Sequence, residues 1–291
     1  IQRFSSAKVS RSARKSNVKL SAAAINGYTM NTGDVFSYNG VVGQRTAANG
    51  YQAAPAYVKG ETVDEIGGGI CQTSSTLYLA CLRSNLEITE RYAHRYIPAY
   101  ITAGMDATVS WGGPDYKFTN NTQYPIKIVT TYADGYLTVK VLGTNVDGTS
   151  VKMTNEWLST TPYEVVYEDD STLPAGTEKV KTSPYTGYKY RTYRNVYDAN
   201  GKLISSTYEA TSDYKSRDKV VLRGPAVESP DTPVLGPEEI PVPSEPGDVT
   251  PAEPGELPEP PTDSANPPET DSGQSPEATP PPLIVIPEEG I

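Results

Sequence analysis

One short stretch of the sequence combines residue types that favour nucleophilic chemistry. Three glycines at positions 67–69 precede Ile70 and Cys71, and the chain continues Gln-Thr-Ser-Ser-Thr-Leu-Tyr. Consecutive glycines cost conformational entropy, so they indicate a sharp turn or a close approach to a ligand. They would bring Cys71 to the first turn of a helix, where the dipole favours a thiolate and N–H groups can bind an oxyanion. The pattern predicts a reactive Cys71, with Gly69 and Gln72 beside the substrate.

Two structural interpretations compete with a reactive Cys71. It is either a buried thiol or one half of a disulfide with Cys81, the second of the two cysteines. Ten residues along a helix separate two Cα atoms by about 15 Å, against roughly 4.4–6.8 Å in a disulfide. A helix that begins at Cys71 therefore excludes the bridge. Cys81 falls on the apolar stripe of the expected helix and is predicted to be a core thiol.

His94 is the single histidine and the only side chain with an ordinary pKa near neutral pH. If Cys71 needs an imidazole base, no other is available, and a third group should orient that imidazole. Asp106 and Asp115 follow at expected strand edges, where each is equally compatible with a turn. Asp106 is the first choice for orienting His94, and Asp115 is an alternative or a substrate contact. The order Cys, His, Asp is similar to papain-like and transglutaminase-like enzymes, which is an analogy of order alone.

The elements that must position these residues are those of an α+β domain over residues 1–147. Residues 11–25 predict a helix that ends near Gly27, and Ser74 to Leu86 predict a central helix after the glycine-rich turn. Antiparallel strands should pack against it. They are expected at 35–38, 107–111, 124–132 and 136–142, and Asp134-Gly135 is typical of a hairpin turn between the last two.

Residues 148–224 change character. Strand-like runs are separated by glycines and Asn200, with no helical periodicity, modest apolar content and many tyrosines. A thin, elongated all-β module is expected. Its tyrosines either stack on sugar rings or cover a sheet that has no second layer, and we favour the second interpretation; they are Tyr185, Tyr188, Tyr190, Tyr193 and Tyr197.

Residues 225–291 form a separate segment by composition. They contain 19 of the 26 prolines and no Lys or Arg, so they are predicted to be a disordered acidic tail. All 25 basic residues precede Pro225 and 15 of the 35 acidic residues follow Gly224, which leaves a net charge of +5 on the first 224 residues. That weak, unclustered charge argues against nucleic acid as a partner.

Composition also limits other function classes. Two cysteines and one histidine exclude a disulfide framework and a metal site built mainly from Cys and His, so neither a metal nor another cofactor is expected. No apolar run of about 18 residues exists, and residues 1–8 do not resemble a signal peptide. The chain is therefore expected to be an ectodomain, touching a membrane only through an anchor outside this sequence.

Residues 11–143 resemble the VanW family. The matching stretches follow the family order: 25–27, 33–39, 42–46, 50–51, 67–78, 90–91 with His94, 104–107, and Asp115 with 118–122. Residues 151–224 resemble a G5 domain through Gly176, Gly187, Gly201 and Gly224 and the ending Val220-Val221-Leu222-Arg223-Gly224. Departures are small, for example Cys81 where relatives commonly have Ala. The resemblance implies a bacterial extracellular protein associated with the cell wall or cell surface.

The VanW resemblance also implies a chemistry, namely L,D-transpeptidase-type cross-linking of peptidoglycan by the family's cysteine. Cys71 would attack a donor stem peptide and pass the acyl group to the side-chain amine of an acceptor stem, with His94 moving protons. Arg91 or Arg95 would hold a stem carboxylate, since Arg binds carboxylates with two hydrogen bonds. Expected partners are stem peptides and glycan strands. The alternatives are hydrolysis by the same residues and a non-catalytic wall-binding or surface-display protein.

Overall fold

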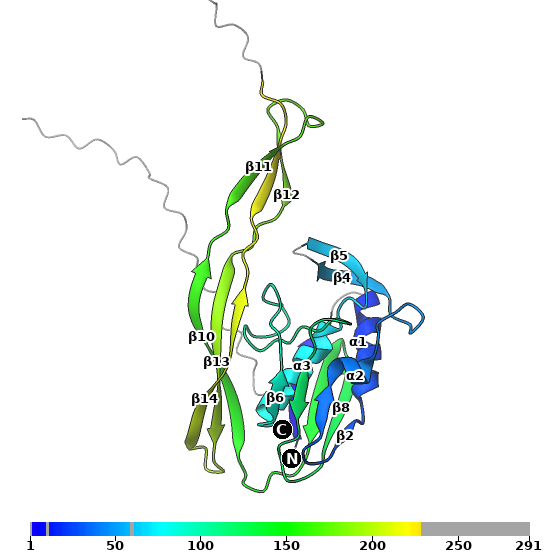
Figure 1. The fold of residues 1–291 in the computed structure, drawn as a ribbon, viewed down its shortest axis with the longest axis vertical. Coiled ribbons are helices and arrows are strands. Elements are labelled where there is room, and N and C mark those ends of the chain that lie inside the picture. Colours follow the sequence, from blue (N-terminus) through cyan, green and yellow to red (C-terminus); the bar gives the residue numbers. More distant parts are fainter. Residues whose placement is uncertain (1, 10–11, 59–60, 228–291) are drawn as a thin grey trace, which may run out of the picture.

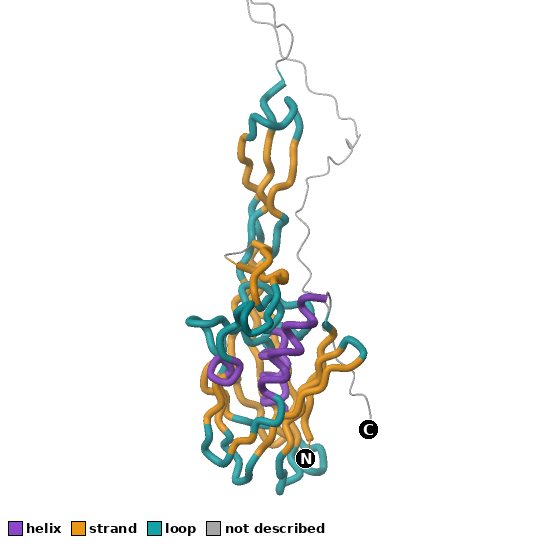
Figure 2. Tube along the Cα trace, turned by 90° about the vertical axis from the view of Figure 1, so that its right-hand side faces the viewer, coloured by secondary structure: helices purple, strands orange, loops and turns teal. Residues whose placement is uncertain are grey.

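The computed structural model describes residues 2–9, 12–58 and 61–227. The predicted disordered tail, 225–291, lies outside the described residues apart from its first three positions. In the described part an α+β domain with all the helices is followed by an elongated all-β module (Figures 1 and 2).

The main sheet of the first domain is antiparallel, in the order β1-β9-β8-β2. Its strands are β1 (Gln2–Lys8), β9 (Tyr136–Leu142), β8 (Ile126–Ala133) and β2 (Thr29–Met30). The predicted β8–β9 hairpin is confirmed, with both turn residues, Asp134 and Gly135, at positive φ. Alternate residues of these two strands, such as Ile128 and Val139, are completely buried, so one face of the sheet forms the core.

Two helices cover that face. They are α1 (Ser12–Ile25) and α3 (Cys71–Arg83). Helix α1 matches the prediction, whereas α3 begins three residues before the predicted start and ends three residues before the predicted end. Asn85, with φ 56°, follows the end of α3, as its residue type suggested.

Helix α3 is enclosed on all sides. It contacts α1, strands β1 and β9 of the main sheet, strand β6 (Glu87–Glu90) and strand β10 (Ser150–Thr161) of the second module. Every residue from Gln72 to Leu82 is buried, including four consecutive hydroxyl residues at 73–76. Ser74 and Ser75 both donate to the carbonyl of Ala107, and Ser75 also accepts from its N–H. Polar residues on a buried helix are tolerated because these bonds satisfy them.

Residues 107–111 do not form the predicted strand. The backbone of Ala107 bonds to serine side chains of α3, and the carbonyl of Val109 faces Cys71, so no ladder with another strand can form. The alternation of apolar residues there reflects extended backbone packed on a helix. Because this segment lies against the start of α3, Asp106, which precedes it, lies near Cys71.

Smaller elements complete the first domain. A three-stranded sheet has the order β3-β7-β6, one antiparallel hairpin projects beside α1, and one short helix precedes it. They are β3 (Val35–Ser37), β7 (Lys117–Thr119), β6 (Glu87–Glu90), β4 (Ala53–Val58), β5 (Glu61–Ile66) and α2 (Tyr38–Val42).

The second module consists of two three-stranded sheets placed end to end, which confirms the elongated all-β prediction (Figure 1). The first is antiparallel, in the order β10 (Ser150–Thr161), β13 (Gly187–Tyr197), β14 (Leu203–Tyr214). The second has the order β11 (Val165–Asp169), β15 (Lys219–Arg223), β12 (Glu178–Thr182), in which β11 and β15 are parallel.

Candidate active site

The glycine-rich turn is shaped by its neighbours as well as by its own flexibility. A Cβ on Gly68 would overlap the carbonyl oxygen of Ala54 in strand β4, and Gly69 has φ +105°, a conformation that favours glycine. Asn17 of α1 donates to the carbonyls of Gly68 (2.9 Å) and Gln52 (2.8 Å). The turn is therefore held between α1 and β4, which fixes where α3 begins.

Cys71 is the first residue of α3 and so lies in the first turn of the helix, where the turn pattern predicted it to be. The N–H groups of Gln72 and Thr73 donate to the carbonyls of Gly69 and Ile70, both at 2.9 Å. Among the described residues the N–H of Cys71 itself has no acceptor. The site thus offers one free N–H donor beside the sulfur, together with the positive end of the helix dipole.

The Cys71 sulfur is partly exposed and faces the segment that follows Asp106. Sγ lies 3.4 Å from the carbonyl oxygen of Val109 and 3.7 Å from Oγ1 of Thr108. Burial raises the pKa of the thiol, but a hydrogen bond from His94 and the positive charge of its ring lower it more, and the pKa falls to about 7. At neutral pH a large fraction of Cys71 is therefore thiolate.

His94 is oriented by Asp106. Its Nδ1 lies 2.6 Å from Oδ2 of Asp106, and its backbone N–H donates to the same oxygen at 2.7 Å. Burial lowers the pKa of the imidazole, but the bonds and charges of Asp106 and Cys71 raise it to about 9. The lowered pKa of Cys71 and the raised pKa of His94 both favour the ion pair of a thiolate and an imidazolium.

The Asp106 carboxylate is completely buried. Its Oδ1 accepts from Nη2 of Arg91 (2.9 Å) and from the hydroxyl of Tyr214 (2.5 Å), a residue of strand β14. Burial raises the pKa of this carboxyl, but the hydrogen bond from His94 and the charge of Arg91 lower it to about 2. The Cys71 thiolate, the His94 imidazolium, the Asp106 carboxylate and the Arg91 guanidinium form a row of charges that alternate in sign. The row as a whole is therefore neutral.

The structure brings three of the predicted site residues together, Cys71, His94 and Asp106. Arg91 lies behind them, because its guanidinium also donates to the carbonyl of Asp106 (2.6 Å) and is 6% exposed. Its guanidinium therefore supports the Asp106 carboxylate. Gly69 lies at the turn beside Cys71.

Gln72 and Asp115 lie in other hydrogen-bond networks. Gln72 is buried and donates to the carbonyl of Lys8 (2.6 Å), which ties α3 to β1. The Asp115 carboxylate accepts from Ser37 (2.6 Å) and from backbone N–H groups, and so holds the start of α2. Asp106, and not Asp115, therefore bonds the His94 ring.

The two cysteines are both free thiols, so the disulfide interpretation is wrong. Cys81 is completely buried in the core, as predicted, and burial raises the pKa of its thiol to about 12. Within the described residues no group of three or more His, Cys, Asp or Glu side chains is arranged to hold a metal ion.

Two further residues, which sequence patterns did not single out, lie near the site. The guanidinium of Arg14, on α1, lies 5.8 Å from the ring centroid of Tyr100, and the Arg14 stem crosses Gly69. Burial, together with the charge of Cys71, raises the pKa of Tyr100 well above the ordinary value. No carboxylate among the described residues pairs with Arg14. The positions of Arg14 and Tyr100 depend on the tertiary fold, and no local sequence pattern indicates them.

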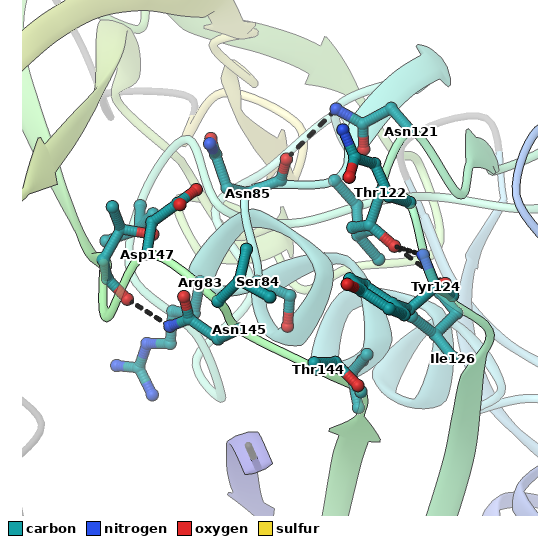
Figure 3. Close-up of a pocket in the computed structure, with 17 residues that line it drawn as sticks. Arg83, Ser84, Asn85, Asn121, Thr122, Tyr124, Ile126, Thr144, Asn145 and Asp147 are labelled. Atoms are coloured by element: carbon teal, nitrogen blue, oxygen red, sulfur yellow. Dashed lines mark hydrogen bonds between the residues drawn. The ribbon is translucent and has the colours of Figure 1, made fainter.

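A separate hollow of about 400 Å³ lies at the other end of α3. Its polar wall includes Asn85, Asn121 and Asn145, with Tyr124 and Ile126 on one side (Figure 3). A helix of 13 residues is about 20 Å long, so this hollow is not part of the Cys71 site.

Comparison with known families agrees with the architecture. Residues 13–142 match the family described as VanW like protein, and residues 151–226 match the G5 domain. The chain thus carries a VanW domain followed by a G5 domain, and both families occur in proteins of the bacterial cell surface and cell wall. No helix among the described residues is long and apolar enough to cross a membrane.

Two curated proteins are similar in sequence to part of this chain. The chain is 40% identical over 156 residues to "Uncharacterized protein YoaR" of Bacillus subtilis, covering 54% of this chain and 52% of YoaR. It is 31% identical over 123 residues to "Vancomycin B-type resistance protein VanW" of Enterococcus faecalis, covering 40% of this chain and 45% of that protein. The chain therefore spans about half the length of these curated relatives.

Two solved G5 structures are similar to the second domain. The IgA1 protease G5 domain is 18% identical, with a TM-score of 0.21, and covers 27% of this chain and 94% of that domain. HP0197-G5 is 17% identical, with a TM-score of 0.17, and the match covers 26% of this chain and 97% of HP0197-G5.

Proposed function

We propose that the VanW domain is a cysteine acyltransferase that cross-links peptidoglycan stem peptides outside the cell. The observation that carries the proposal is the row Cys71, His94, Asp106 at the start of a buried helix. There His94 lies beside the Cys71 thiol and lowers its pKa, and Asp106 is hydrogen-bonded to the His94 ring. The VanW and G5 matches support a cell-wall substrate over other acyl donors.

In the first half-reaction the Cys71 thiolate attacks a carbonyl carbon of the donor stem peptide. A C–S bond forms, and the carbonyl electron pair moves onto oxygen, where the free N–H of Cys71 and the helix dipole stabilise it. When the intermediate collapses, the C–N bond breaks and the proton on His94 passes to the departing amine of the terminal D-residue. A thioester on Cys71 and a neutral His94 remain.

In the second half-reaction the side-chain amine of an acceptor stem attacks the thioester. His94 takes a proton from the attacking nitrogen, the C–S bond breaks, and the thiolate and imidazolium are restored. Asp106 remains a carboxylate throughout and holds the imidazole in one orientation. Hydrolysis uses the same groups with water as the acceptor, so the acceptor decides between the two reactions.

We assign the role of binding the donor carboxylate to Arg14. It reaches the site over Gly69, whereas Arg91 is occupied by Asp106. Arg14→Gln is expected to raise KM for the donor stem about 10-fold or more with little change in kcat, because a hydrogen-bonded charge pair contributes about 1.5–3 kcal/mol. Steady-state kinetics would measure this, with Lys15→Gln, an exposed neighbour on α1, as control. Equal KM values for the two variants would remove Arg14 from the substrate site.

The experiment that tests the proposed function uses purified disaccharide stem peptides as both donor and acceptor. The protein, its Cys71→Ala variant and a Cys81→Ala control are incubated with them, and the products are separated and identified by mass spectrometry. Cross-linked dimers from the wild type and the control, but not from Cys71→Ala, are expected. Shortened monomers without dimers would indicate hydrolysis. Unchanged substrate would leave wall binding without catalysis, the function that the G5 match supports on its own.

A further inference from the structure

The loop that carries His94 and Asp106 is packed against the G5 domain. Tyr190 and Tyr214 of strands β13 and β14 form a buried cluster with Ala103 of that loop, joined at its edge by Ala93 and Ile97. Tyr185 extends the contact, because its ring lies 4.8 Å from that of Tyr96 and its hydroxyl accepts from the N–H of Ile97 (3.0 Å). These tyrosines therefore pack between the domains, which neither sequence interpretation anticipated.

Tyr214 makes the most direct contact with the site. Its hydroxyl donates to Oδ1 of Asp106 at 2.5 Å and accepts from the N–H of Gly104 at 2.6 Å. Both bonds are buried, and the residue itself is 1% exposed. One hydroxyl of the G5 domain thus holds the Asp106 carboxylate and the backbone two residues before it.

A second contact supports Arg91. Ser212, also on β14, accepts from Nη1 of Arg91 at 2.8 Å, on the opposite side from Asp106. Gly104 permits this close approach, since a Cβ there would overlap the Thr192 side chain of β13. Two of the groups that bond Asp106 therefore depend on the second domain. Tyr214 belongs to that domain, and Arg91 is held by Ser212 of that domain.

We propose that the G5 domain completes the active site of the VanW domain, with Tyr214 as a positioning residue that fixes Asp106 and thereby His94 and Cys71. The thiol is then fully activated only while the G5 domain is docked. This inference rests on the proposed role of Cys71 as nucleophile, but its test does not require acyl transfer.

The test is the pH dependence of Cys71 alkylation by iodoacetamide in the full chain, followed by peptide mass analysis. Tyr214→Phe keeps the ring and removes the hydroxyl, so Asp106 loses one hydrogen bond, holds His94 less firmly and lets the thiol pKa rise. The labelling midpoint is expected to move up by about half to one pH unit. Ser212→Ala should move it in the same direction by less, because it acts through Arg91.

Tyr190→Phe is the matched control. It makes the same chemical change in the same interface, where the Tyr190 and Tyr214 ring centroids are 6.5 Å apart, and Tyr190 does not touch Asp106. The groups facing Cys71 and Asp106, namely His94, Tyr38, Tyr100, Arg91 and Tyr78, stay the same in all three variants.

A shift in Tyr214→Phe that is absent in Tyr190→Phe supports the inference, even if no cross-linked product is ever found. Equal midpoints in the wild type and Tyr214→Phe, or equal shifts in both tyrosine variants, overturn it, because Tyr214 would then be only part of the domain packing. Loss of cross-linking with a normal midpoint in Tyr214→Phe likewise overturns the positioning role while leaving the proposed function standing.

Discussion

A His94→Gln variant is expected to lose acyl transfer by about 10³- to 10⁴-fold while remaining folded. In the proposed reaction His94 supplies the proton for the departing amine and receives the proton of the attacking amine, and general acid–base catalysis of this kind contributes about 10²–10⁴-fold. The variant also loses the positive charge that offsets the burial of Cys71. Rates of dimer formation from stem peptides would measure the combined effect.

Alkylation of the His94→Gln variant measures the effect of His94 on the Cys71 thiol separately from its effect on proton transfer. The pKa of the Cys71 thiol should rise from about 7 to its ordinary value or above, because burial is no longer opposed by the imidazolium. Alkylation at pH 7 should fall only about 10-fold, since a thiolate of higher pKa is intrinsically more nucleophilic. Arg95→Gln, which removes a neighbouring exposed charge, is the control. A midpoint that stays near 7 in His94→Gln would show that His94 does not activate the thiol.

An Asp106→Asn variant is expected to lower the free energy of unfolding by about 3–5 kcal/mol, because it leaves a buried Arg91 guanidinium without its charge partner. Urea unfolding at neutral pH would measure the loss. The folded-state pKa of Asp106, about 2, lies below its ordinary value of 3.8. Its carboxylate therefore stabilises the protein above pH 4, and this contribution disappears as the pH falls through 2. The difference between wild type and variant should shrink over that range.

Asp115→Asn provides the comparison for this prediction. The Asp115 carboxylate is also buried, but it accepts only from neutral donors, the Ser37 hydroxyl and two backbone N–H groups. Its replacement should cost about 1–3 kcal/mol and leave the alkylation midpoint of Cys71 unchanged. Equal losses of stability in the two variants, with no change of midpoint in Asp106→Asn, would contradict the charge row described here.

Local sequence signals predicted much of the first domain. Helix α1 and the β8–β9 hairpin with its Asp134-Gly135 turn both follow from residue types within a few positions. The start of α3 was placed at Ser74, three residues late, because a glycine-rich turn gives no capping signal and Ile70 makes no side-chain cap. Residues 107–111 were misassigned as a strand because extended backbone bonded to side chains has the same alternation as a strand.

The candidate site was partly predictable because its nucleophile and base are chemically conspicuous. Cys71 follows three glycines, and His94 is the single histidine. The choice of Asp106 over Asp115, and the position of Arg91 behind the carboxylate, required coordinates, since either aspartate fits a turn. Tyr214 lies 108 residues from Asp106 in another domain, and no periodicity or spacing connects residues that far apart.

Three of the five tyrosines predicted to cover the sheet lie at the domain interface: Tyr185, Tyr188 and Tyr190. A thin sheet with many tyrosines has the composition of a sugar-binding platform or of a single-layer cover. In this chain Tyr188 and Tyr190 instead pack onto the loop that carries His94. The module is therefore both an elongated spacer and a wall of the neighbouring site. Its composition predicted the elongated shape but not the contact.

Activation of Cys71 in the resting protein can be measured as the rate of Cys71 alkylation by iodoacetamide between pH 5 and 10. Cys81 serves as an internal reference, because its thiol is buried and has a pKa of about 12. The structure predicts that labelling of Cys71 rises with a midpoint near pH 7 and that Cys81 stays unlabelled. A Cys71 midpoint at or above about 8.5, the value of an ordinary thiol, would mean that the protein does not activate this thiol.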